Sequence, residues 1–280
     1  MLRLDRLEPR DTPAALLGAA DTIPTETVSG FFLGSDRLLD ATVAGPGGGP
    51  VLQLTDPLTG DVLQAVYAAD PAGRTGLHAH TIAGTTGGRG LGLPTPPDRI
   101  VLTFDAGGGD NVLILTASLD NSRLEVAEQV SAGLGPDFRG GLQVTSASDQ
   151  PFGATAHAPQ ILLLPASAGY APHLVALDPD TGAVTHSVYV GDPLDRSAPP
   201  TLDPLGGSFQ VTQGADAGTV AVLVYTAPAD PVTGSRPYQA YTFDLARQDY
   251  GRDVTADLAA LPSGLPSARP KGLVGTGPLN

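Results

Sequence analysis

Two histidines that stand close together in the chain are the first residues whose type and spacing suit chemistry. His78 and His80 lie two positions apart in the segment Gly-Leu-His-Ala-His-Thr. On a β-strand, residues two apart point to the same face, so both imidazoles would share one side of a sheet. Such a pair could give a metal ion two ligands or face a bound anion. Zinc normally takes a third protein ligand, and none is evident from the spacing, which favours the alternative that both are ordinary strand or loop residues.

A glycine-rich loop is the second candidate. Residues 105–111 read Asp-Ala-Gly-Gly-Gly-Asp-Asn and stand between two apolar segments. The carboxylates of Asp105 and Asp110, together with backbone carbonyls, are the oxygen ligands that Ca²⁺ prefers. Calcium is therefore the one cofactor that the sequence suggests, and a wide turn between strands is the alternative interpretation of the same loop.

Exposed tyrosines are the third candidate. Tyr170 and Tyr238 fall in turn-rich segments of the second half of the chain, where their rings could stack on sugars or contact partner proteins. Packing between sheets is the alternative. No catalytic residue can be assigned, because the chain has no Cys, no Gly-x-Ser-x-Gly segment, and a single lysine near its end. The Gly-rich segment 87–92 lacks the helix and the lysine of a phosphate-binding loop.

A repeated turn marks the elements that must position these residues. The motif Asp-Pro-x-Thr-Gly occurs at residues 56–60, 178–182 and 230–234, with a degenerate copy at 120–123. Asp accepts a backbone N–H, Pro presets φ, and Gly takes the left-handed conformation, which together favour a tight turn between antiparallel strands. The motif therefore predicts four similar hairpins along the chain.

Apolar segments flank every copy of this turn. The predicted strands before the turn are 51–55, 112–119, 173–177 and 220–226, and those after it are 61–68, 124–132, 183–190 and 237–245. A further strand is expected before each of these hairpins. Its predicted ranges are 99–105, 160–165 and 208–213, and residues 30–33 are a weaker candidate for the corresponding strand of the first unit. The runs Val112–Leu115 and Ile161–Leu164 are apolar at successive positions, which predicts burial on both faces, as in stacked sheets.

The composition supports the same fold class. Of 280 residues, 36 are Gly and 27 are Pro, and neither is tolerated well inside long helices. We therefore predict an all-β protein of repeated three- to four-stranded antiparallel units, β-propeller-like or built of stacked sheets, with minimal helix.

The predicted organisation has three parts. An N-terminal segment spans residues 1–29, a β-repeat domain spans 30–252, and a short helix with an extended arm spans 253–280. Within the β-repeat domain, the units cover about 30–83, 98–135, 141–191 and 207–250. A further short helix is expected at 12–20, because Thr12 suits the cap and Pro13 the first helical position.

The segment His173–Val190, which reads HLVALDPDTGAVTHSVYV, resembles the repeat of quinoprotein-type and related β-propellers, and Leu52–Ala68 is a poorer match. In that repeat, an apolar strand ending in Ala-Leu-Asp meets an x-x-Thr-Gly turn and then another strand. The resemblance implies a propeller-like arrangement of the units. The chain has no Trp, which is the hallmark residue of the repeat, and no cofactor-binding residue is carried over.

Charge and hydropathy narrow the classes of partner. The net charge is −14, whereas binding to a nucleic-acid backbone needs clustered Lys and Arg. No run of 18 apolar residues predicts a membrane span. The N-terminus lacks the apolar core of a secretory signal, so we expect synthesis in the cytoplasm, followed by assembly into a virion or another extracellular particle.

These features predict a non-enzymatic structural or adhesive protein of a larger assembly, such as a tail, fibre, spike or decoration component of a virus or phage particle. Its expected partners are other protein subunits, in a homo- or hetero-oligomer. Two alternatives stay open. One is a propeller-like module that binds a surface glycan or a protein through its loops. The other is a polysaccharide-active hydrolase or lyase that works with Asp and His residues.

Overall fold

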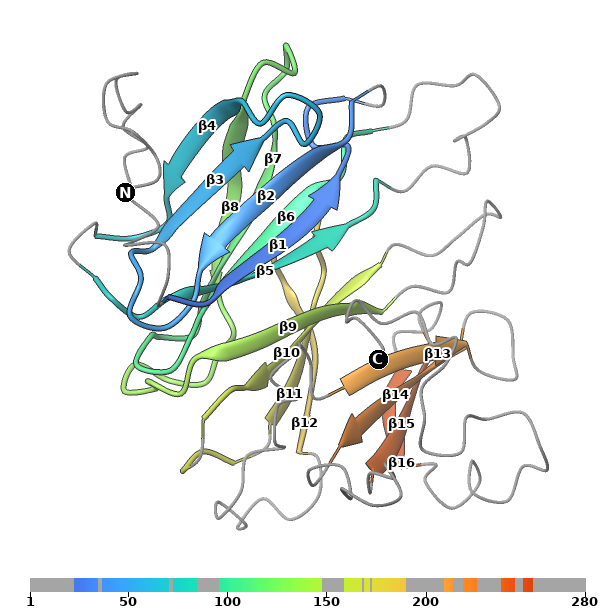
Figure 1. The fold of residues 1–280 in the computed structure, drawn as a ribbon. Helices are drawn as coiled ribbons and strands as arrows, with labels where there is room; N and C mark the ends of the chain where they lie inside the picture. Colours follow the sequence, from blue (N-terminus) through green and yellow to red (C-terminus); the bar gives the residue numbers. More distant parts are fainter. Residues whose placement is uncertain are drawn as a thin grey trace, which may run out of the picture. The chain divides into compact units, whose positions relative to one another are not determined.

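The computed structural model describes residues 23–34, 37–70, 73–84, 96–147, 159–167, 169–171, 173–189, 209–213, 219–225, 238–244 and 249–253, the last four ranges by their backbone alone. Within these residues all regular secondary structure is β-strand, which confirms the predicted all-β class (Figure 1). The strands of the first half are β1 (Thr25–Gly30), β2 (Leu39–Ala44), β3 (Val51–Thr55), β4 (Val62–Tyr67), β5 (Leu77–Ile82), β6 (Arg99–Phe104), β7 (Asn111–Ala117) and β8 (Leu124–Ser131). Those that follow are β9 (Leu142–Ala147), β10 (Gln160–Pro165), β11 (His173–Leu177), β12 (Val184–Tyr189), β13 (Phe209–Gln213), β14 (Thr219–Tyr225), β15 (Tyr238–Asp244) and β16 (Asp249–Asp253).

The strands form four sheets of four, each of which takes its strands in chain order. The sheets are β1–β4, β5–β8, β9–β12 and β13–β16. Every pairing within the first, second and fourth sheets is antiparallel, and so are the pairings of β10 with β11 and of β11 with β12. The short turns predicted from Gly, Pro and Asp explain this meander, because antiparallel neighbours can be joined by tight hairpins.

The repeated turn has the local structure that its residues predict. Asp56 joins the end of β3 to the turn, where its Oδ1 accepts the N–H of Leu58 at 2.8 Å. Asp178 does the same after β11, where its Oδ1 accepts the N–H of Asp180 at 2.7 Å. The closing glycines, Gly60 and Gly182, have φ of 76° and 67°, a conformation that side chains other than Gly rarely adopt.

The degenerate copy begins two residues earlier than its sequence suggests. The turn between β7 and β8 closes with a hydrogen bond from Ser118 N to Arg123 O, which corresponds to the bond from Asp56 N to Asp61 O. Segment 118–123, rather than one beginning at Asp120, is therefore the counterpart of 56–61. The residue with positive φ in this turn is Asn121, at 55°, which Asn tolerates better than most residues.

Each sheet has four strands, which agrees with the predicted three- to four-stranded units and adds one strand to the three assigned around each turn. In the first three sheets the additional strand comes first, as β1, β5 and β9, whereas in the fourth sheet β16 comes last. The strand expected at 30–33 is not observed: Gly30 ends β1, and the residues that follow form a turn. The strand that precedes β3 and β4 in the first sheet is instead β2, at Leu39–Ala44. Asp253, where a helix was expected to begin, ends β16, while 254–280 and the helix expected at 12–20 lie outside the described residues.

The chain divides into two compact units, residues 1–144 and 145–280. In the first unit, the sheets β1–β4 and β5–β8 enclose one apolar core, to which β2 and β3 contribute Leu39, Leu52 and Leu54, and β5–β7 contribute Leu77, Ile100 and Leu115. The burial predicted for both faces of the central strands is confirmed. All four residues of Val112–Leu115, and likewise Ile161–Leu164 in the second unit, are at most 2% exposed.

Candidate functional site

The most unusual polar cluster of the first unit surrounds His78. Its Nδ1 lies 3.1 Å from Oε2 of Glu26, across the interface between β5 and β1. Its Nε2 is buried and lies 3.7 Å from Oδ2 of Asp105, too far for a hydrogen bond but close enough for an ion pair. One imidazole is thus placed between two carboxylates that come from different sheets.

The charges of this cluster determine its protonation. Burial disfavours the charged ring, but Asp105 and Glu26 outweigh that penalty and raise the pKa of His78 to about 9. For Asp105, burial favours the neutral acid, yet His78 and the N–H of Ala106 together hold the pKa of this carboxyl below its usual value. At neutral pH the cluster therefore consists of an imidazolium and two carboxylates, which is an arrangement that binds two sheets together.

Further polar contacts accompany this cluster along β1 and β5. Thr81 Oγ1 donates to Ser29 O at 3.3 Å, and both this pair and the pair of Glu26 with His78 are 52 residues apart in sequence. The equal offset shows that β1 and β5 run side by side in the same direction. Beyond β1, Asp98 accepts hydrogen bonds from Phe31 N and Gly84 N, each at 2.8 Å.

The second histidine of the predicted pair has the opposite environment. His80 is 3% exposed, and burial lowers its pKa to about 4, so its ring is neutral at pH 7. Although His78 and His80 do share one face of β5, one is a partly exposed cation and the other a buried neutral ring. In the part of the chain that the structure describes, no group of three or more His, Cys, Asp or Glu side chains is arranged to hold a metal ion.

The two aspartates of the glycine-rich loop have separate partners. Asp105 faces His78, whereas Asp110 Oδ2 accepts the hydroxyl of Ser131 at 2.6 Å and the N–H of Leu134 at 3.0 Å. A turn bond from Gly108 N to Asp105 O closes the loop. The loop also lies against Gly141, where an added Cβ would stand 2.3 Å from the carbonyl carbon of Asp105. Asp105 and Asp110 thus hold a turn in place.

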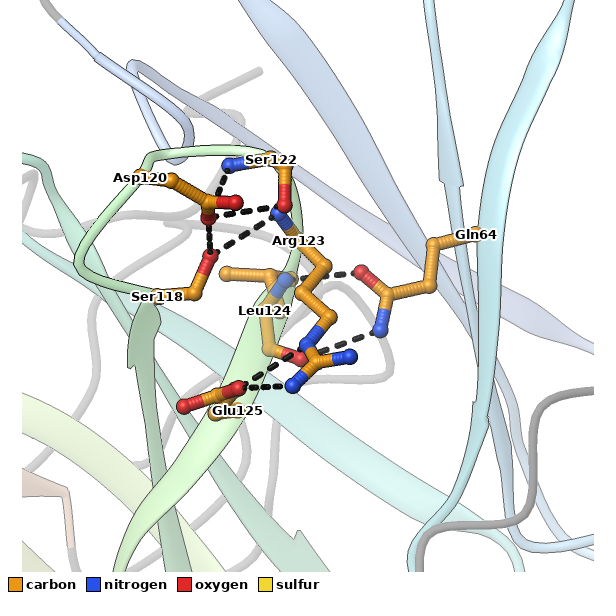
Figure 2. A network of polar contacts seen from close by, with 7 residues as sticks. All are labelled: Gln64, Ser118, Asp120, Ser122, Arg123, Leu124 and Glu125. Atoms are coloured by element: carbon orange, nitrogen blue, oxygen red, sulfur yellow. Dashed lines mark hydrogen bonds and ion pairs between the residues drawn. The ribbon is translucent and has the colours of Figure 1, made fainter.

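A polar network connects the outer strands of the same two sheets, as Figure 2 shows. The side-chain amide of Gln64, on β4, donates to Leu124 O at 3.0 Å and accepts from Leu124 N at 2.7 Å. In the turn before β8, Asp120 Oδ1 accepts from the hydroxyls of Ser118 and Ser122 at 2.6 and 2.7 Å. These hydroxyls, followed by the N–H of Ser122, lower the pKa of Asp120 to about 2.

The turns at this end of the first unit expose large apolar side chains. Leu58, in the β3–β4 turn, is 92% exposed, and Leu119, in the β7–β8 turn, is fully exposed. Both turns lie at the same end of the first unit (Figure 1). At the start of β4, Val62 and Leu63 are 39% and 38% exposed. We call Leu58, Val62, Leu63 and Leu119 the tip patch.

The structure locates only one of the two candidate tyrosines in full. Tyr170 lies before β11 and is partly buried, while Tyr238 begins β15 and its side chain lies outside the described residues. Sequence reasoning missed Tyr189, which stacks on His173 across β11 and β12 with ring centroids 4.5 Å apart. Counting outward from the Asp178 turn would have placed Val188 opposite His173, because a β-bulge between Ala176 and Leu177 shifts the register by one residue. No signal in the sequence pointed to Glu26, which only sheet stacking brings to His78.

The fold and these contacts define a repeat-built, antiparallel all-β protein. No protein-family model matches the chain, and no curated protein matches it in sequence. The described residues include no helix that is long and apolar enough to cross a membrane.

Proposed function

We propose that this chain is a non-enzymatic structural component of a larger protein assembly, such as a tail, fibre, spike or decoration protein of a virus or phage particle. The observation that carries the proposal is the tip patch, in which two leucines are almost completely exposed on turns at one end of the first unit. Burying apolar surface of this kind against a partner subunit would stabilise the assembly by about 25 cal/mol per Å².

The turns that present these leucines are already ordered. Arg37 forms an ion pair with Asp56, which in turn accepts the N–H of Leu58, and the pKa of Asp56 is lowered by Arg37 first and then by that N–H. Asp120 holds the turn of Leu119 through two serine hydroxyls. Because an ordered loop loses little conformational entropy on binding, such tips are well suited to docking.

The His78 cluster supports a non-enzymatic role. A general base works best when its pKa lies near the operating pH, whereas His78, with a pKa of about 9, keeps its proton at neutral pH. Its position between Glu26 and Asp105 joins the first two sheets, which is a structural role.

The size of the species that contains the chain in its own host tests this proposal. We expect a tagged chain in the host extract to elute from a sizing column well above its own 28.3 kDa. The double substitution Leu58→Ser with Leu119→Ser should release it as a monomer. Stability should change by no more than about 0.5 kcal/mol, because both side chains are exposed.

Leu38 provides the matched control, since it is 47% exposed in the same unit but does not belong to the tip patch. The variant Leu38→Ser should elute with the wild-type assembly. Elution of the unmodified chain from the host extract as a lone monomer would contradict the proposed function.

A further inference from the structure

The second unit presents an aromatic pair on its outer hairpin. His173 on β11 is opposite Tyr189 on β12 in the antiparallel register, so both side chains point to the same face. Their rings stack with centroids 4.5 Å apart and an interplanar angle of 20°. Since Tyr189 is still 48% exposed, one face of its ring is supported by His173 while much of the side chain stays open to solvent.

A hydroxyl group continues this face along β12. Ser187 lies two residues before Tyr189, so the alternation of the strand places both on one side. Thr185 is the extra residue of a β-bulge, since Ala176 pairs with His186 and Leu177 with Val184. The hydroxyl of Ser187 is hydrogen-bonded to Nε2 of His173. Thr185 Oγ1 donates to Oε1 of Gln160 at 2.7 Å, which connects the bulge to β10. We call His173, Ser187 and Tyr189 the aromatic strip.

We infer that the aromatic strip binds a neutral pyranose oligosaccharide. A pyranose ring has a face of C–H groups bordered by hydroxyls, and the negative π-face of a tyrosine attracts C–H groups of this kind. A neighbouring sugar along β12 would meet Ser187, whose hydroxyl can both donate and accept. The strip thus offers an apolar platform with a polar group beside it.

Charge selects the neutral members of this ligand class. The chain has a net charge of −14, which repels sulfated or carboxylated glycans at a distance. Burial lowers the pKa of His173, the only titratable group in the strip besides the Tyr189 phenol, so at neutral pH the platform carries no positive charge that would attract an anion.

A single tryptophan introduced at position 189 provides the direct test. The chain has no Trp, so Tyr189→Trp keeps an aromatic platform and adds one fluorescent reporter. The probes are cellotetraose, chitotetraose and mannotetraose, with a heparin fragment as the anionic comparison. We expect saturable change in the emission with at least one neutral probe, at a Kd on the order of 1 mM, and none with heparin. Tyr67→Trp, on β4 of the first unit, is the matched control and should not respond.

The unmodified chain supplies a second, independent measurement. Saturation-transfer NMR should show the bound tetrasaccharide with wild-type protein, and Tyr189→Ala should weaken this binding about tenfold or more, while Tyr189→Phe should retain most of it. If none of the three neutral probes binds the wild-type chain, or if Tyr189→Ala binds as well as wild type, the inference is wrong and the stack serves only to pair β11 with β12.

This inference does not rest on the tip patch. The variant with Leu58→Ser and Leu119→Ser should bind the same tetrasaccharide as the wild-type chain, because those residues belong to the first unit. Failure of the chain to assemble would therefore contradict only the proposed assembly role of the tip patch. Failure to bind sugar would contradict only the role proposed for the aromatic strip.

Discussion

His78 and His80 are two residues apart on β5, and yet their pKa values shift in opposite directions. Two carboxylates raise the pKa of His78 to about 9, whereas burial lowers that of His80 to about 4. In an unfolded chain both would titrate near 6.5. The folded protein therefore binds a proton at His78 more tightly than the unfolded chain does, and a proton at His80 less tightly.

The two shifts predict how stability depends on pH. As pH falls from about 6.5 towards 4, His80 binds a proton in the unfolded chain but stays neutral in the native state, so the free energy of unfolding decreases. As pH rises from about 6.5 towards 9, the contribution of the protonated His78 is lost, so the free energy of unfolding decreases again. Each slope has an upper limit of about 1.4 kcal/mol per pH unit for one proton.

Urea unfolding of the single variants at a series of pH values separates the two residues. His80→Asn should reduce the slope of the free energy of unfolding against pH between about 4 and 6.5 and leave the slope above pH 6.5 unchanged. His78→Gln should reduce the slope between about 6.5 and 9 and leave the slope at acid pH unchanged. Equal slopes in wild type and His78→Gln between pH 7 and 9 would show that the ion pairs with Glu26 and Asp105 contribute nothing to stability.

At the scale of elements, Gln64 closes a free edge. The hydrogen bond from Ser118 N to Arg123 O fixes the last backbone pair of the β7–β8 turn, so the next residue, Leu124, directs its N–H and C=O away from β7. Gln64 satisfies both groups with its side-chain amide and thereby joins β4 to β8. An outer strand is thus bonded at a position where another chain could otherwise add to the sheet.

Replacing this amide should destabilise the first unit. Gln64→Ala leaves the N–H and C=O of Leu124 without their partners, which we expect to cost about 1–3 kcal/mol in the free energy of unfolding. Gln129→Ala is the matched control, because Gln129 is an exposed glutamine on β8 and its loss should change stability by less than about 0.5 kcal/mol. Chemical denaturation of both variants provides the comparison, and similar losses would contradict the role given to Gln64.

At the scale of the whole molecule, the net charge of −14 is the dominant property. Repulsion among so many carboxylates opposes a compact state, and salt screens it with a Debye length of about 10 Å at 0.1 M. We expect the thermal unfolding midpoint to rise with NaCl concentration between about 0.01 and 0.15 M. No change, or a lower midpoint, would show that repulsion is already balanced by nearby cations.

The same experiment tests the calcium site suggested by Asp105 and Asp110. CaCl₂ at the ionic strength of the NaCl series should raise the midpoint equally if it acts by screening alone. Because Asp105 is paired with His78, and Asp110 with Ser131 and Leu134, we expect this equal effect. A larger rise with calcium, abolished by Asp110→Asn, would instead identify a specific site.

Much of the local structure of this protein is determined by its sequence alone. The turns at Asp56 and Asp178 could be predicted because each depends on an Asp, a Pro and a Gly within five residues, and doubly buried strands such as Val112–Leu115 could be recognised by their uninterrupted apolar residues. The strand at Leu39–Ala44 was missed, since it follows a turn without the repeated motif.

Only the tertiary structure decides which distant residues meet. Glu26 and His78 are 52 residues apart, and no spacing rule connects them. They meet because β1 and β5, which belong to different sheets, lie side by side in the folded protein. The same stacking makes one histidine of β5 a cation and the other neutral, since a pKa depends on the charges and the solvent that surround a group in three dimensions.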